Sequence, residues 1–100
     1  TGLCANIPEG YEIQVRPRSG LALKYGVTVL NTPGTIDSGY KDEIKVILVN
    51  LSNTPYTVEP GERIAQFVVG KLVDDVDSVE VSEINTTNDR GGGFGHSGKF

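Results

Sequence analysis

The residues best suited to bind an anion lie in one short run, Arg16 to Ala22, which reads RPRSGLA. Ser19 and Gly20 open a helix-compatible stretch, so a hydroxyl and free backbone N–H groups meet at the positive end of a helix dipole. Arg18 adds a full positive charge beside them. The run predicts an anion site, while a capping serine next to a solvated arginine is the plainer interpretation of the same residues.

A second group of reactive side chains lies between residues 31 and 40, in the run NTPGTIDSGY. Proline and glycine constrain this loop, and an aspartate held in a rigid loop can serve as a general base. We therefore consider Asp37 a candidate base. The alternative is an aspartate that closes an Asx-turn, with Tyr40 as a half-buried aromatic residue.

A polar amide interrupts the third group, the apolar run from Arg63 to Val69. We expect Ile64, Phe67 and Val69 to belong to the core. Gln66 shares the face of Ile64 by the period of two in a strand, so its amide is predicted to point inward. A buried amide needs hydrogen-bond partners, which either the fold or a ligand can provide.

The fourth group is the C-terminal sequence RGGGFGHSGKF, residues 90–100. Arg90 offers forked hydrogen bonds, and the glycines let backbone approach a phosphate closely. Phe94 can stack on a flat ring, and His96 and Ser97 add donors. It is not a P-loop, because no Gly-Lys-Ser/Thr follows a strand and leads into a helix. A disordered tail is the alternative.

Strand signals dominate the segments that must position these groups. Apolar and polar residues alternate over Tyr11–Arg16, which places Tyr11, Ile13 and Val15 on one face. Residues 43–50 become wholly apolar at their far end, which predicts cover on both sides there. Further strands are predicted at residues 27–30, 56–58, 63–69 and 79–81, and a short helix is predicted over 19–26, capped by Ser19 and ended by Gly26. The pattern favours an all-β antiparallel sandwich or barrel of jelly-roll type with one short helix.

Composition limits the classes of function. One hundred residues with a net charge of −4 predict a single small domain, stabilised by partner subunits, and argue against nucleic-acid binding. No apolar run is long enough for a membrane helix, and no signal peptide is recognisable, so a cytoplasmic, nuclear or viral setting is expected. Cys4 and His96 are the only residues of their types, which excludes an internal disulfide and a multi-histidine metal site. Composition shifts after Ile84, which predicts a β domain over 1–84 and a flexible arm over 85–100.

Together the four groups resemble the second to fifth motifs of the trimeric dUTPase family, the deoxyuridine triphosphate nucleotidohydrolases. RPRSGLA, GTIDSGY, GERIAQ and RGGGFGHSG occur in the order of that family, spread from Arg16 to Gly98. The resemblance implies a jelly-roll-like fold and a homotrimer with shared active sites. It also implies hydrolysis of dUTP to dUMP and pyrophosphate, with Mg²⁺ held by the substrate phosphates and waters rather than directly by this chain.

The resemblance assigns roles to individual residues. Asp37 matches the aspartate that activates the attacking water, and Tyr40 the tyrosine that packs under the deoxyribose and excludes a 2′-hydroxyl. The uracil edge would be bound by Asn31 with nearby backbone, and the nucleoside bordered by Lys45. The resemblance places four residues at the phosphates: Arg18, Ser19, Gly20 and Gln66. The further substrate-binding residues of the third motif are Gly34, Thr35 and Ile36.

In the family that this chain resembles, the C-terminal arm crosses to another subunit and closes over bound nucleotide. Phe94 would stack on the uracil, with Gly95 beside it. Arg90, His96 and Ser97 would reach the phosphates. Such a lid excludes water and completes the site only when substrate is present.

The sequence departs from the family pattern in three places. The first motif, of the type Ala-Gly-x-Asp-Leu, is absent, and Thr1-Gly2-Leu3 matches the stretch that follows it. We therefore expect a missing N-terminal portion, by truncation or as a companion segment. Asp42 stands where a glycine is common. The motif RGGGFG is one residue shorter than usual, which shifts Arg90 relative to Phe94.

Two other interpretations follow from these departures. Without the first motif, the chain would be a catalytically impaired relative that acts as a binding or regulatory module. A dCTP deaminase relative would share the fold, but that enzyme needs a glutamate to handle the exocyclic amine. The third motif reads Ile36-Asp37-Ser38-Gly39-Tyr40, which is the style of the hydrolases.

Overall fold

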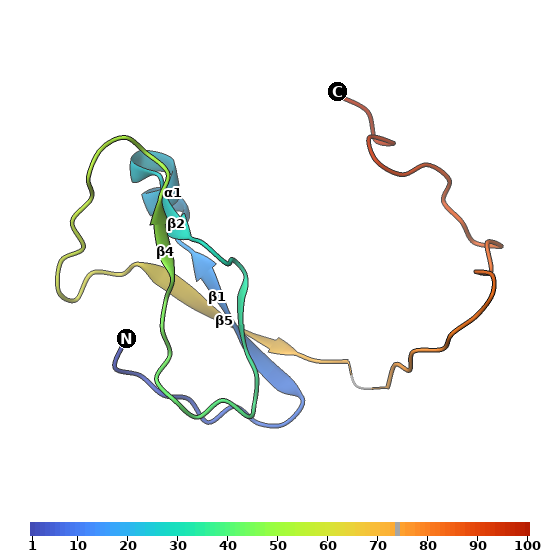
Figure 1. Ribbon diagram of the computed structural model, residues 1–100, viewed down its shortest axis with the longest axis horizontal. Helices are drawn as coiled ribbons and strands as arrows, with labels where there is room; N and C mark the ends of the chain where they lie inside the picture. The colour runs from blue at the N-terminus through green and yellow to red at the C-terminus, as the bar shows by residue number, and fades with distance from the viewer. Residues whose placement is uncertain (74) are drawn as a thin grey trace.

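The computed structural model describes residues 1–73 and 75–100 (Figure 1). Its regular elements within these ranges are β1 (Tyr11–Pro17), α1 (Ser19–Tyr25), β2 (Val27–Val29), β3 (Gly34–Ile36), β4 (Leu48–Asn50) and β5 (Ala65–Lys71). The strands form one sheet in the order β3-β1-β5 and a second in the order β2-β4, and every pairing is antiparallel. The predicted fold class, antiparallel and all-β with one short helix, is confirmed.

Strand β1 is the centre of the larger sheet. It pairs with β5 along its whole length, from Tyr11 opposite Lys71 to Pro17 opposite Ala65. On its other side, β1 pairs with the short strand β3 from Ile13 to Val15. Val15 is buried, as its apolar position in the alternating pattern predicts.

Helix α1 packs directly after β1 and is seven residues long. Its N-cap is Arg18, and Ser19 is the first helical residue, with no side-chain capping bond at this described end. The prediction that Ser19 caps the helix is therefore wrong. Gly26 ends the helix in the left-handed conformation, with its N–H bonded to the Ala22 carbonyl. A Cβ on Gly26 would lie 3.1 Å from the backbone nitrogen of Ser52, so both the backbone conformation and this close contact favour glycine.

The buried apolar side chains come from segments far apart in the sequence: Ile7, Val15, Val27, Val29 and Ile44. Phe67 and Val69, expected in the core, are 38% and 67% exposed. Strand β5 is at the edge of its sheet, and these two side chains on its apolar face are left exposed. Ile47 is 51% exposed, so the predicted cover on both sides of residues 43–50 is also wrong.

Several predicted strands are shorter or absent in the described residues. Only Leu48–Asn50 of the 43–50 run forms a ladder, and 56–58 and 79–81 form none. The 56–58 run lies between Pro55 and Pro60, which cannot donate to a ladder. The side chains of 79–81 are exposed. Strand β3 was predicted as loop, because three residues that begin with glycine carry no alternation signal.

The chain leaves the sheets after Lys71 and extends away from them (Figure 1). Its described residues beyond this point are exposed and contain neither helix nor strand. The radius of gyration is 19.0 Å, whereas a compact domain of this length measures about 13 Å. The boundary between a domain at 1–84 and an arm at 85–100 stays a prediction. No helix in the described residues has the length and apolar character to cross a membrane.

Candidate functional site

A cavity of about 210 Å³ opens between strand β3 and the segment that follows it. Its lining consists of Thr35, Ile36, Asp37, Tyr40, Ile44 and Lys45. All of these except Ile44 were predicted as site residues. Ile44 is a buried residue that was assigned to a strand, and its neighbour Lys45 in the alternating run was the available signal.

Asp37 lies at the end of β3, in a tight turn. Its Oδ1 accepts a hydrogen bond of 2.9 Å from the backbone N–H of Gly39, and its carbonyl accepts one of 3.3 Å from the N–H of Tyr40. This is the Asx-turn that was considered as the alternative to a catalytic role. Because the same carboxylate lines the cavity, the turn fixes the group instead of excluding it from chemistry.

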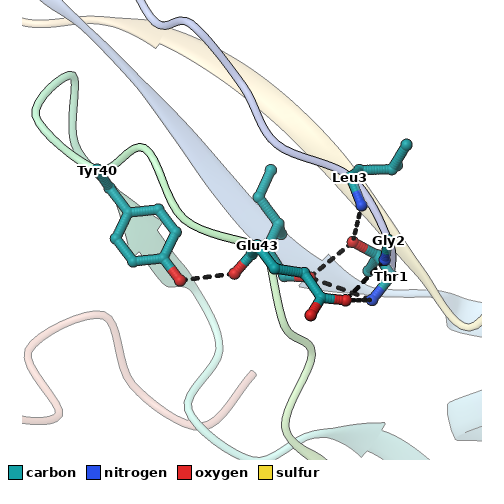
Figure 2. A network of polar contacts seen from close by, with 6 residues as sticks. Thr1, Gly2, Leu3, Tyr40 and Glu43 are labelled. Carbon is teal, nitrogen blue, oxygen red and sulfur yellow. Dashed lines mark hydrogen bonds and ion pairs between the residues drawn. The ribbon is translucent and has the colours of Figure 1, made fainter.

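The Tyr40 ring is held at the cavity by its own hydroxyl group. That hydroxyl donates a hydrogen bond of 2.6 Å to the carbonyl oxygen of Glu43. Figure 2 shows the Tyr40 ring lying between its own backbone and that of Glu43. The side chain is 38% exposed, so it is a half-buried aromatic that still presents a surface to a ligand.

The Glu43–Ile44 segment is tied to the start of the described chain (Figure 2). The Glu43 carboxylate accepts a bond of 2.8 Å from the Gly2 N–H and forms an ion pair of 3.2 Å with the amino group of Thr1. The backbone of Ile44 bonds the Thr1 hydroxyl at 2.6 Å and the Leu3 carbonyl at 2.8 Å. The Gly2 N–H, followed by the Thr1 amino group, holds the pKa of Glu43 below its ordinary value.

A second cluster brings together residues of the second and fourth motifs at one end of the β1–β5 pair. Arg18 Nη1 donates a bond of 3.0 Å to the carbonyl of Arg63. Gln66 Nε2 donates one of 2.9 Å to the carbonyl of Pro17. Gln66 is exposed, so the prediction that it points into the core is wrong. Its position opposite Arg16 places it on the polar face of the sheet instead.

The cavity and this cluster lie at opposite edges of the larger sheet. Ile36 of β3 pairs with Ile13 of β1, so the next residue, Asp37, lies beside Glu12. On the other side of β1, Gln66 of β5 pairs with Arg16. Strands rise about 3.3 Å per residue and lie about 4.8 Å apart, which puts Asp37 and Gln66 about 16 Å from each other along the sheet. The candidate base and the candidate phosphate ligands of one chain are therefore separated.

The remaining predicted residues fall into two places. Asn31 lies beside the buried Gly34, where a Cβ would approach Asn31 Nδ2 at 3.4 Å and Val15 Cβ at 3.3 Å. The predicted residues of the arm lie in the exposed part of the chain after β5, which has neither helix nor strand: Arg90, Phe94, Gly95, His96 and Ser97. Two local turns form in this segment. In one the His96 N–H donates to the Gly93 carbonyl, and in the other the Gly98 N–H donates to the Gly95 carbonyl. The structure does not bring these arm residues to the cavity.

Metal-binding side chains do not gather anywhere in the part of the chain that the structure describes. No three of its described His, Cys, Asp and Glu residues form a group that could hold an ion.

Comparison with known proteins connects this arrangement to one family. The sequence model of the dUTPase family matches residues 1–98. The deoxyuridine 5′-triphosphate nucleotidohydrolase of Fusobacterium nucleatum subsp. nucleatum is 63% identical over 99% of this chain and 67% of its own length. The protein of the same name in Chlamydia muridarum is 59% identical over 99% of this chain and 68% of its own. The protein of the same name in Hydrogenobaculum is 57% identical over 98% of this chain and 67% of its own length. With its motifs in family order and a match over nearly all its length, this chain belongs to the dUTPase family.

Proposed function

We propose that this protein hydrolyses dUTP to dUMP and pyrophosphate. The observation that carries the proposal is the cavity in which Asp37, Tyr40 and Lys45 meet around one small volume. Membership of the dUTPase family and relatives named for this activity support it.

Asp37 is the proposed base of the reaction. Its carboxylate is restrained by the Gly39 N–H, so it can hold a water molecule in a fixed direction for in-line attack on the α-phosphorus. The water loses its proton towards the carboxylate as the new P–O bond forms. The P–O bond to the β-phosphate breaks, and pyrophosphate leaves.

Tyr40 is the proposed selector for deoxyribose. Because its hydroxyl is bonded to the Glu43 carbonyl, the ring cannot easily rotate away to admit a 2′-hydroxyl. The uracil is proposed to meet Asn31 and the backbone of Gly34, Thr35 and Ile36. Gly34 suits that role because a side chain there would crowd Val15, whose Cβ would lie 3.3 Å from the added carbon.

The phosphates are proposed to bind Arg18, Ser19, Gly20 and Gln66. Arg18 and Gln66 are already anchored to backbone carbonyls, which lowers the entropic cost of ordering them around a ligand. Magnesium would arrive on the triphosphate and neutralise part of its charge. Arg90, Phe94, Gly95, His96 and Ser97 would close over the bound nucleotide as a lid.

The distance between the two clusters supports shared sites. An offset of about 16 Å along the sheet favours a base and phosphate ligands that serve different nucleotides. A cyclic homotrimer, in which each copy supplies the cavity of one site and the phosphate cluster of the next, satisfies this geometry.

The proposal is tested by Asp37→Asn in the intact protein, with magnesium and dUTP. We expect kcat for pyrophosphate release to fall by roughly 100-fold or more, because a general base contributes about 10² to 10⁴ in rate. The affinity for dUTP should change by less than about threefold, since the amide has the same shape. Asp42→Asn, which removes an exposed carboxylate nearby, is the matched control.

An Asp37→Asn protein with full activity would remove this residue from the reaction. A wild-type protein that binds dUTP without turnover would support the binding module instead. Ammonia release from dCTP would identify a deaminase.

A further inference from the structure

We propose that Tyr56 and Glu62 are positioning residues for the phosphate cluster, because their side-chain hydrogen bond fixes the turn that holds Arg18 in place. The inference rests on the proposed function, in that it concerns how Arg18 is presented to a triphosphate. It adds a pair of residues that contact no substrate themselves.

The pair forms a short, charge-assisted contact. The Tyr56 hydroxyl donates to Glu62 Oε1 at 2.6 Å, within the range typical of an O–H group on a carboxylate. Glu62 Oε2 accepts the Glu59 N–H at 3.4 Å, and the N–H of Glu62 bonds the Glu59 carbonyl at 3.0 Å. The carboxylate therefore links Tyr56 to both ends of the 59–62 turn.

The Tyr56 ring is also fixed from the side of the helix. It packs on the Tyr25 ring with centroids 4.9 Å apart and the planes tilted by 46°. Tyr25 is the last residue of α1, the helix that begins directly after Arg18. The Gly26 carbonyl accepts the Leu51 N–H at 2.8 Å, which holds the 51–56 segment to the same helix end.

Arg18 is connected to this turn through Arg63, the residue that follows it. Arg63 follows Glu62 in sequence, and its carbonyl accepts the bond from Arg18 Nη1 at 3.0 Å. An arginine side chain has many rotamers, and a guanidinium that already donates one N–H to a fixed carbonyl keeps its other N–H groups available for an anion. If the turn moves, Arg18 loses its anchor and binding must order the side chain anew.

The state of the tyrosine proton agrees with this geometry. The bond to Glu62, followed by partial burial, raises the pKa of Tyr56 to about 12. The hydroxyl therefore stays a donor across the pH range in which an enzyme would work.

The test uses Tyr56→Phe, which keeps the ring packing and removes only the hydroxyl. We expect the dissociation constant of a dUTP analogue with an imido bridge between the α and β phosphorus atoms to rise roughly three- to tenfold. The dissociation constant of dUMP, which lacks the outer phosphates, should change by less than about twofold. Tyr11→Phe removes the same atom elsewhere and should change neither constant.

The link through Arg18 is tested by repeating the measurement in an Arg18→Ala background. There Tyr56→Phe should have no further effect on the analogue, because the residue through which it acts is gone. Glu62→Ala should match Tyr56→Phe, and the double variant should be no weaker than either. Glu62→Gln keeps an acceptor and should restore most of the affinity. Equal losses for dUMP and the analogue, or an undiminished loss in the Arg18→Ala background, would overturn the proposal.

A measurement without nucleotide separates this proposal from the proposed function. Rotation of the Arg18 guanidinium, followed by arginine-selective ¹⁵N NMR, should become faster in Tyr56→Phe than in wild type or Tyr11→Phe. Unchanged rotation would contradict the positioning role even in an active dUTPase. Faster rotation in a protein that does not bind dUTP would support the pair and refute the proposed function.

Discussion

Tyr56 donates its hydroxyl to a carboxylate, whereas Tyr40 donates to a backbone carbonyl. The difference is a matter of charge. A phenolate beside Glu62 would face a negative partner, so the neutral form of Tyr56 is favoured and its pKa rises from 10.0 to about 12. Tyr40 makes no such contact with a carboxylate among the described residues.

This charge difference predicts a separate ionisation step. Tyr56 should ionise in a phase near pH 12, followed by the absorbance at 295 nm. Because the folded pKa lies above the unfolded one, the stabilisation from the bond is fully present below pH 10 and is lost as the pH rises towards 12. Tyr56→Phe should remove the late phase and Tyr11→Phe should not, with circular dichroism confirming that the samples stay folded. A late phase that persists without Tyr56 would contradict the assignment.

Single residues of the cavity were predictable because the third motif is contiguous in sequence. Asp37 and Tyr40 fall on the same turn, so their proximity follows from local geometry alone. Gln66 could not be placed in the same way. Which face of the sheet it lies on depends on the register of β5 against β1, where it opposes Arg16, and that register cannot be read from β5 alone.

At the scale of elements, Gly26 joins the helix to the second sheet. Its φ of 69° is in the left-handed region, and it lies against the backbone of Ser52 just after β4. The helix end, the start of β2 and the end of β4 therefore meet at a position without a side chain.

We expect Gly26→Ala to destabilise the fold by about 1 to 2 kcal/mol from the left-handed conformation alone, and by more from the contact with Ser52. The matched control is Gly61→Ala, which has a φ of 79° but nothing within 4 Å of the added carbon. The difference in unfolding free energy between the two variants, from denaturant titration, measures the contact. Equal losses would show that the Ser52 backbone moves aside at no cost.

Elements with a strong local pattern were predictable, and elements defined by a partner were not. Strand β1 alternates over its length, and α1 is bounded by Gly26, so both were placed correctly except for the cap. Residues 79–81 show an apolar alternation but have no described strand to pair with. Strand β3 forms by pairing with β1, where Gly34 lies close to Val15, and its own sequence carries no strand pattern.

At the scale of the whole molecule, the cavity and the phosphate cluster lie on opposite sides of β1. Under the proposed function, a chain with this layout contributes one part of each of two sites. The exposed apolar side chains of β5, including Val69, are consistent with partner copies that cover this face.

Mixing two inactive variants tests this layout. In the proposed homotrimer, Asp37→Asn disables the cavity part of the site and Arg18→Ala the phosphate part, so each variant alone should be inactive. After unfolding and refolding of an equal mixture, about a quarter of the sites should combine an intact half from each variant and recover activity. A mixture as inactive as its components would show that both halves of each site come from one chain.

The separation of the two halves also has a genetic consequence. Two alleles of the gene, one altered at Asp37 and the other at Arg18, would complement each other in a cell that carries both. A cell with only one of the two altered alleles beside a normal one would lose half of its sites in either layout, so only the combination of the two altered alleles would reveal the sharing. In the proposed homotrimer, selection would therefore act on the assembled ring, because each site takes residues from two chains.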